Sequence, residues 1–223
     1  MSAPEGYYDQ PRLEVVAMVP QNVKHVIDVG CASGALGAAL KAARPGIEVR
    51  GIEPVLAQAD RARRVLDDVH VGGADDPLPS HWPPADCVIF ADVLEHMVDP
   101  WKTVRTFRSV LASGGSVVSS VPNVAHRSVL GGLVRQRWDY HEEGILDRTH
   151  LRFFTRETAL EMFEQGGFSV RRVARVTEGL GQKPLGRFIR RAIDRENGRD
   201  RIYARPLGLI IDALTVQFLI VAD

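Results

Sequence analysis

The segment that most constrains the fold is residues 26–34, which read VIDVGCASG. Apolar and mostly β-branched residues surround Asp28, and a turn of small residues follows as far as Gly34. The apolar run predicts a buried strand. In an open α/β sheet, ligands bind beyond the carboxyl ends of the strands, and a turn without large side chains lets a ligand approach the backbone. The segment therefore predicts a ligand-binding strand end with a carboxylate beside it.

Strand-like and helix-like segments alternate along the rest of the chain. We expect strands at residues 23–30, 47–54, 68–73, 85–92, 116–123, 168–176 and 213–222. We expect the main helices at residues 34–46, 54–67, 99–114 and 155–166. Alternating units of this length predict an α/β fold, with a mostly parallel sheet and helices on both faces.

We expect residues 1–223 to form a single domain with three segments outside this pattern. They are an N-terminal lid at 1–20, a lid connection at 122–150 and an Arg-rich insert at 177–212. Long connections in α/β proteins often form lids or substrate walls. The chain therefore has candidate segments for covering a site at the sheet edge.

Charge and composition exclude several classes of protein. Lys and Arg together number 28, as do Asp and Glu, so no basic field favours nucleic acid as a partner. Cys31 and Cys87 lie in or beside apolar runs, which suits buried, reduced thiols in a cytoplasmic protein. No apolar stretch approaches the roughly 20 residues of a membrane span. The oligomeric state is not indicated.

A second acid indicates the kind of ligand. Glu53 ends the second predicted strand, about twenty residues after the first motif, where a carboxylate suits the hydroxyls of a ribose. The phosphate-binding pattern G-x-G-x-x-G is absent, and Asp28 would repel a pyrophosphate. The two acids therefore predict an adenosine ligand with a cationic amino-acid tail.

Several segments together resemble one family. VIDVGCASG resembles the first motif of the class I S-adenosylmethionine-dependent methyltransferases, and GIEP (51–54) resembles their second-strand acid. FADVLEHMVDPWKTV (90–104) resembles the fourth-strand motif of the branch that includes ubiquinone-type O-methyltransferases. The segments at 111–123 and 150–170 also resemble their counterparts. The resemblance implies a Rossmann-like, seven-stranded sheet with an antiparallel last strand, and S-adenosyl-L-methionine as the cofactor.

The resemblance also implies which residues bind the cofactor. Asp28 and Gly30 would border the methionine moiety, Glu53 would bind the ribose and Pro54 would flank the adenine. The family's Gly-Asp-Ala after the third strand is replaced by Gly-Gly-Ala, which leaves Asp75 as a displaced candidate for the adenine amino group. The complete predicted set is Asp28, Gly30, Ala32, Gly34, Glu53, Pro54, Asp75, Ala91 and Asp92.

Two histidines are candidate catalytic bases. Methyl transfer to a hydroxyl group requires removal of its proton, and near neutral pH the usual base is histidine. Among seven histidines, His96 follows the fourth predicted strand at its carboxyl end, and His150 closes the lid connection. The alternative for His96 is a purely structural contact with the backbone. Aromatic and polar residues of the covering segments are further candidates around the acceptor: Tyr7, Tyr8, Asn123, Trp138, Tyr140 and His141.

A metal site is a further possibility at the same place. Asp92, Glu95, His96 and His150 offer mixed oxygen and nitrogen ligands that suit Mg²⁺ or Mn²⁺. Their spacing is similar to that of the RNA 3′-terminal 2′-O-methyltransferases, which hold a metal at the ribose hydroxyls. The favoured hypothesis is O-methylation of a small-molecule or glycan acceptor with a histidine base. The alternatives are a metal-dependent RNA methyltransferase and a noncatalytic adenosine-ligand-binding regulatory protein.

Overall fold

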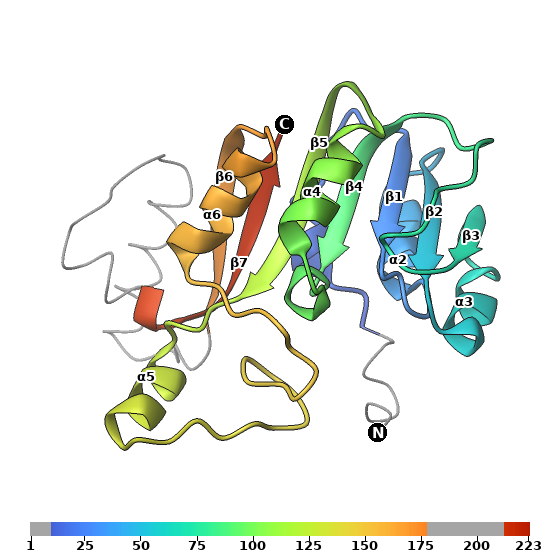
Figure 1. The fold of residues 1–223 in the computed structure, drawn as a ribbon. Helices are drawn as coiled ribbons and strands as arrows, with labels where there is room; N and C mark the ends of the chain where they lie inside the picture. Colours follow the sequence, from blue (N-terminus) through green and yellow to red (C-terminus); the bar gives the residue numbers. More distant parts are fainter. Residues whose placement is uncertain (1–9, 178–211) are drawn as a thin grey trace.

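A seven-stranded sheet forms the centre of the protein (Figure 1), in the strand order β3-β2-β1-β4-β5-β7-β6. The structure is a computed structural model that describes residues 10–177 and 212–223. The strands are β1 (His25–Val29), β2 (Glu48–Glu53), β3 (Asp68–Val71), β4 (Ala85–Ala91), β5 (Leu111–Pro122), β6 (Val170–Thr177) and β7 (Thr215–Ala222). Strands β1 to β5 pair in parallel, and β7 is antiparallel to both of its neighbours. The predicted fold class is confirmed, including the antiparallel last strand.

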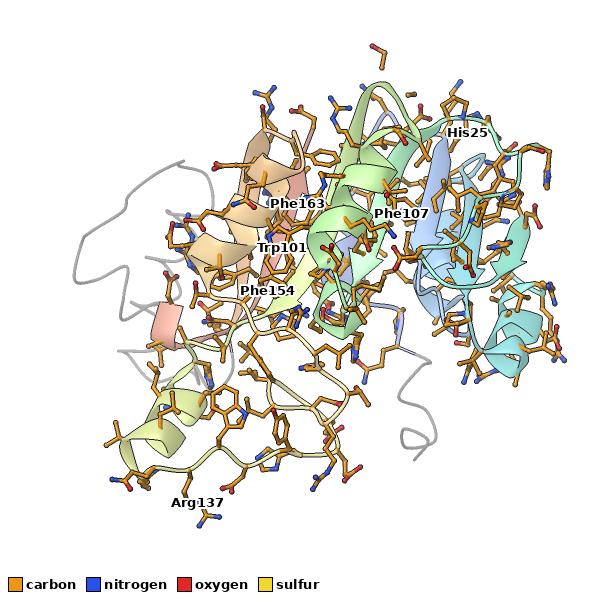
Figure 2. The ribbon with its side chains drawn as sticks, viewed as in Figure 1. His25, Trp101, Phe107, Arg137, Phe154 and Phe163 are labelled. Atoms are coloured by element: carbon orange, nitrogen blue, oxygen red, sulfur yellow. The ribbon has the colours of Figure 1, made fainter. Side chains whose placement is uncertain are left out.

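Helices cover both faces of the sheet. The helical segments are α1 (Leu13–Val16), α2 (Ala35–Ala43), α3 (Leu56–Ala62), the 3₁₀ turn η2 (Leu94–His96), α4 (Pro100–Arg108), α5 (Arg127–Val134) and α6 (Arg156–Gln165), and of these α5 lies away from the sheet (Figure 1). Val26 packs into a core cluster with residues of α1, α2 and α3, whereas the next residue, Ile27, packs with residues of α4 and α6. Figure 2 shows Phe107 and Phe163 on the α4 and α6 side. Because both faces are buried, the central strands read as continuous apolar runs.

The predicted helix starts at Asp99 and Thr155 are confirmed by their caps, whereas α3 begins at Leu56 and not at the predicted Pro54. Asp99 accepts a hydrogen bond from the Lys102 N–H at 2.9 Å, and Pro100 is the first residue of α4. Thr155 and Thr158 form a reciprocal capping box at the start of α6. Both arrangements satisfy N–H groups that have no partner within the helix.

Several predicted boundaries are wrong, including the end of the helix predicted at 54–67, which the structure places at Ala62. Helix α4, which follows the fourth strand, ends at Arg108 instead of Gly114, and β5 begins at Leu111 instead of residue 116. Ala85 pairs with Leu111, and a register shift before Cys87 absorbs the extra residues in the sheet. The 122–150 connection also contains α5, which the sequence analysis did not predict. Its two central glycines interrupt the apolar pattern that would have indicated a helix.

Much of the predicted covering sequence lies outside the described residues. This applies to nearly all of the insert at 177–212 and to the first part of the lid at 1–20, with Tyr7 and Tyr8. None of the helices in the described ranges has the length and apolar character needed to cross a membrane.

The topology points to one edge of the sheet. The strand order reverses direction between β1 and β4, and in open α/β sheets ligands bind in the crevice beyond the carboxyl ends of the strands at such a point. Asp28 lies near the end of β1, Glu53 is the last residue of β2 and Asp92 directly follows β4. The fold therefore brings the predicted acids to the place where an open α/β sheet binds ligands.

Gly51 keeps the first turn in contact with β2. A Cβ atom at Gly51 would lie 2.4 Å from Cys31 Sγ and 2.8 Å from Leu66 Cδ1. We therefore expect Gly51→Ala to lower the free energy of unfolding by about 2 kcal/mol in urea titrations. Gly73→Ala is the matched control, because its Cβ would meet no atom closer than 3.7 Å. Equal stability of the two variants would contradict this packing argument.

Candidate active site

Two buried carboxylates lie at the carboxyl ends of β1 and β2. Asp28 is 2% exposed, and its Oδ2 atom has no hydrogen-bond partner among the residues that the structure describes. Glu53 accepts hydrogen bonds from the N–H groups of Ala32 and Val55, each at 2.9 Å. Burial, followed by the nearby Glu53, raises the pKa of Asp28 to about 7. Burial also raises the pKa of Glu53, against the effect of its two backbone bonds. A buried carboxylate oxygen without a partner is a natural acceptor for a ligand.

The turn after β1 requires small residues for conformational reasons as well. Gly30 and Gly34 have φ angles of +68° and +82°, in the left-handed region. A Cβ at Gly30 would lie 2.8 Å from Val93 Cγ2, so the turn packs directly against the loop after β4. Ala32 has φ +47°, a conformation that costs energy for a residue with a side chain. The small residues thus keep the two sides of the crevice close together.

The other predicted cofactor-binding residues differ in their exposure and in their contacts. Pro54 is exposed just beyond Glu53, and it is followed by Val55 and Leu56, which are 54% and 58% exposed. Ala91 is the partly buried last residue of β4. The predicted role of Asp75 gains no support, because its Oδ1 atom faces α4. There it accepts a hydrogen bond from Thr103 Oγ1 at 3.4 Å.

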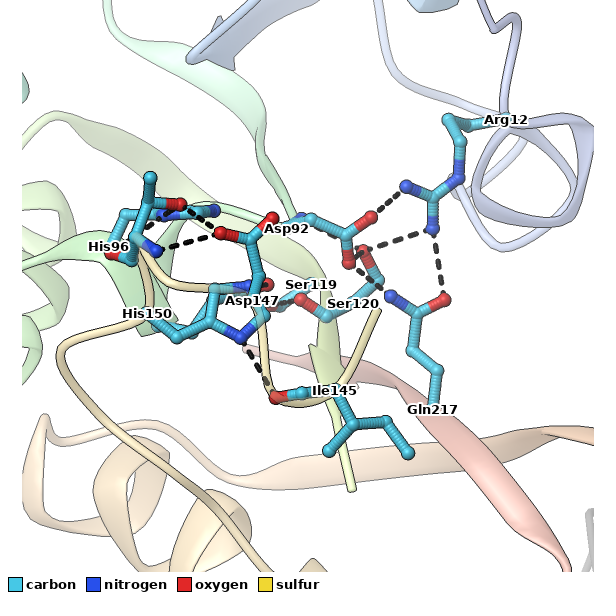
Figure 3. A network of polar contacts seen from close by, with 11 residues as sticks. Arg12, Asp92, His96, Ser119, Ser120, Ile145, Asp147, His150 and Gln217 are labelled. Atoms are coloured by element: carbon cyan, nitrogen blue, oxygen red, sulfur yellow. Dashed lines mark hydrogen bonds and ion pairs between the residues drawn. The ribbon is translucent and has the colours of Figure 1, made fainter. Parts of the chain in front are cut away.

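Asp92 belongs to a polar network that spans the ends of three strands (Figure 3). Its Oδ2 atom pairs with Arg12, and its Oδ1 atom accepts hydrogen bonds from Ser120 Oγ at 2.9 Å and from the Gln217 amide. Arg12 Nη2 donates to Gln217 Oε1 at 2.9 Å. The sequence analysis missed Arg12, Ser120 and Gln217, since no local pattern relates residues so far apart in the chain.

A second group lies next to this network and consists of Glu95, His96 and His150. One ligand atom from each of the three lies within 4.8 Å of the others. Glu95 is 1% exposed, and within the described ranges neither of its carboxylate oxygens has a hydrogen-bond partner. Its backbone carbonyl accepts the N–H groups of Leu151 and Arg152 at 2.8 and 3.0 Å. These two bonds bring His150 to Glu95 from a distant part of the sequence.

The hydrogen bonds of the two imidazoles define which nitrogen faces the group. His150 Nδ1 lies 3.0 Å from the carbonyl oxygen of Ile145, which only accepts, so Nδ1 carries the proton (Figure 3). His150 Nε2 therefore presents a lone pair toward Glu95 Oε1, 4.0 Å away. His96 Nδ1 makes the equivalent contact with the Thr149 carbonyl at 3.2 Å. Burial lowers the pKa of His150, so the ring is neutral at pH 7.

The predicted four-residue metal set is therefore only partly assembled. Glu95, His96 and His150 come together, whereas both carboxylate oxygens of Asp92 bind other side chains. Burial and then Asp92 raise the pKa of Glu95 well above its ordinary value.

Aromatic residues of the lid connection lie beside His150. Phe153 is the centre of this cluster, with ring centroids 5.2 Å from Trp138, 6.4 Å from Tyr140 and 6.3 Å from His150. Tyr140 is 43% exposed. Asn123, in contrast, is fully buried, and its amide donates to the carbonyls of Asp212 and Thr215 at 2.8 Å. It anchors the chain instead of facing an acceptor.

The chain was also compared with known proteins. The sequence profile of a protein family described as "Methyltransferase domain" matches residues 7–173. The ubiquinone biosynthesis O-methyltransferase of Xylella fastidiosa is 31% identical over 119 residues, which cover 50% of this chain and 48% of that protein. Its counterpart from Xanthomonas campestris is 32% identical over 115 residues, or 49% and 47% of the two chains. The chain thus spans about half the length of the curated relatives it matches.

Solved structures share the fold. A SAM-dependent methyltransferase from Thermotoga maritima, described as a possible histamine N-methyltransferase, has a TM-score of 0.64 at 16% identity, covering 97% of this chain and 88% of its own. One from Archaeoglobus fulgidus has a TM-score of 0.61 at 16% identity, covering 96% and 94%. The O-methyltransferase NcsB1, in complex with S-adenosylmethionine and a naphthoic acid, has a TM-score of 0.58 at 18% identity, covering 95% and 52%. Because the family profile spans most of the sequence and the fold agrees, the chain belongs to the class I S-adenosylmethionine-dependent methyltransferase family.

Proposed function

We propose that this protein binds S-adenosyl-L-methionine at the crevice between β1 and β4 and transfers its methyl group to an oxygen atom of a small-molecule or glycan acceptor. The observation that carries the proposal is the buried carboxylate oxygen of Asp28 beside Glu53, which has no hydrogen-bond partner in the described part of the chain. The curated relatives, which are named as O-methyltransferases, support oxygen as the accepting atom.

The residues around the crevice suit the parts of this cofactor. The Asp28 carboxylate would bind the cationic amino group of the methionine tail, and Gly30 would let that tail approach the backbone. Glu53 would accept hydrogen bonds from the ribose hydroxyls with the lone pairs that its two backbone bonds leave free. Pro54 and the exposed side chain of Val55 offer an apolar surface to the adenine.

The transfer itself requires alignment and removal of one proton. When bound, the cofactor supplies an activated methyl group and a neutral thioether leaving group. The acceptor oxygen forms its bond to the methyl carbon as the carbon–sulfur bond breaks, and the hydroxyl proton passes to a base. We assign this role to His150, because its buried and neutral imidazole presents the Nε2 lone pair. Glu95 Oε1, 4.0 Å from Nε2, is placed to accept a hydrogen bond from the imidazolium that would form.

The same group supports a second candidate, in which Glu95, His96 and His150 hold a divalent cation. The specific observation is that both Glu95 oxygens are buried without partners and face two imidazoles whose Nδ1 protons bind carbonyls. Such bonds from the far ring nitrogen are typical of metal-ligating histidines. A cation held there would lower the pKa of an acceptor hydroxyl group. With the ion bound, the histidines would act as ligands instead of bases.

Calorimetry with Mn²⁺ separates the two candidates. If the cation site exists, the wild type binds Mn²⁺, and Glu95→Gln weakens that binding by more than about tenfold, because the only carboxylate ligand is lost. Glu157→Gln, an exposed acid on α6, is the matched control and should bind like the wild type. No binding by the wild type, together with turnover that survives chelation, would leave His150 as the base.

An RNA acceptor receives less support. The similarity to the RNA 3′-terminal enzymes extends to three of the four predicted ligands, and the chain carries no net charge. The noncatalytic alternative predicts that the protein binds S-adenosylhomocysteine but methylates no hydroxylated acceptor. Calorimetry with this ligand, together with a turnover assay, tests that alternative.

A further inference from the structure

We infer that Arg12 and Gln217 are positioning residues that hold Asp92 out of the Glu95, His96 and His150 group, so that a cation there meets three protein ligands instead of four. This inference rests on the cation candidate of the proposed function. It concerns which ions the site accepts.

The position of Asp92 in the chain makes its exclusion informative. It lies three residues before Glu95, at the entrance to η2, and its spacing alone would place it among the ligands. Instead, its Oδ2 atom pairs with Arg12, and its Oδ1 atom is shared by Ser120 and Gln217. Among the described residues, the ligand atoms that come within 4.8 Å of one another do not include one from Asp92.

The contacts around Asp92 form a closed ring. Arg12 binds Asp92 and donates to Gln217 Oε1 at 2.9 Å, while the Gln217 amide donates back to Asp92. The Asp92 N–H group donates to Ser120 Oγ at 3.0 Å. Asp92 itself has φ +55°, in the left-handed region, which is unfavourable for an aspartate unless the surroundings hold it there.

Both partners are attached to rigid parts of the fold. Arg12 directly precedes α1, where Val15 and Val16 are buried in the core. Gln217 lies within β7, where it pairs with β5 on one side and with β6 on the other. The two residues therefore reach Asp92 from elements that do not move with the loop after β4.

The number of carboxylate ligands influences which cation binds. Two imidazole nitrogens and one carboxylate suit ions such as Mn²⁺, Co²⁺ and Zn²⁺, whereas Mg²⁺ prefers oxygen ligands. A second carboxylate from Asp92 would strengthen binding in general and would favour Mg²⁺ in particular. By keeping Asp92 out of the group, Arg12 thus favours cations that bind nitrogen ligands over Mg²⁺.

The test compares Mn²⁺ and Mg²⁺ binding by calorimetry in wild type, Arg12→Met and Arg12→Met/Asp92→Asn. We expect Arg12→Met to bind Mn²⁺ about tenfold more tightly, because a released carboxylate joins the site, and to gain measurable Mg²⁺ binding. Both gains should disappear in the double variant. Arg148→Met, which removes an exposed arginine from its pair with Glu142, is the matched control and should leave both affinities unchanged.

Each outcome bears on the inference. Equal affinities in wild type and Arg12→Met, or a gain that persists without Asp92, overturn it. If neither protein binds Mn²⁺, the cation candidate fails and the inference fails with it, while binding of S-adenosylhomocysteine still tests the methyltransferase proposal. If Arg12→Met does not fold, Gln217→Leu opens the same ring from β7, and it should produce a smaller gain in the same direction.

Discussion

Replacing His150 with alanine is expected to lower kcat about a thousandfold without changing the affinity for S-adenosylhomocysteine. The acceptor hydroxyl loses either its base or a metal ligand, whereas the cofactor crevice, built by Asp28 and Glu53, is untouched. Turnover is measured with a hydroxylated acceptor that the wild type methylates, and cofactor affinity is measured by calorimetry.

Two comparisons make this result specific to the site. His81→Ala removes a histidine that is largely exposed and pairs with Asp68 at 2.9 Å, and it should turn over like the wild type. His96→Ala should impair turnover if the two imidazoles act together, since their ring centroids lie 4.7 Å apart. Near-normal turnover in His150→Ala would remove this residue from the mechanism.

Replacing Asp28 with asparagine is expected to weaken binding of S-adenosylhomocysteine about a hundredfold, because a buried charged partner of the cationic tail becomes neutral. Asp60→Asn, which changes an exposed carboxylate on α3, is the matched control. Calorimetry at pH 8 makes the comparison with Asp28 ionised in the wild type. If the two variants bind equally well, the assignment of the crevice is wrong.

The raised pKa of Asp28 adds a dependence on pH. Without bound cofactor, the pKa of Asp28 is about 7. The affinity of the wild type for S-adenosylhomocysteine should therefore fall as the pH drops below 7, by up to about tenfold per pH unit. Asp28→Asn should lack this dependence.

The free energy of unfolding depends on pH in the opposite direction. Because the folded pKa exceeds the ordinary value of 3.8, the folded protein loses stability as the pH rises from about 4 to 7. Without bound cofactor, Asp28→Asn should therefore have a higher free energy of unfolding than the wild type, and the difference should be largest at pH 8.

The sheet, its layers and the acids at its carboxyl edge could be predicted from local sequence patterns. Apolar runs at strand length, helix caps such as Asp99 and Thr155, and acids at strand ends such as Asp28 and Glu53 are local patterns. Each reflects burial or hydrogen bonding between residues close in the chain, so the pattern survives without knowledge of the fold. The start of β5 was mispredicted because a register shift opposite Cys87 depends on the neighbouring strand.

The side chains that come together around Glu95 and His150 could not be predicted from the sequence, because their contacts depend on the tertiary fold. His150 reaches Glu95 through backbone bonds to Leu151 and Arg152, and no spacing in the sequence indicates them. Asp92 has the sequence position of a metal ligand but is captured by Arg12 and Gln217, 80 and 125 residues away. Contacts of this kind follow from the packing of α1 and from the place of β7 within the sheet, and packing between distant segments leaves no periodic signal in the chain.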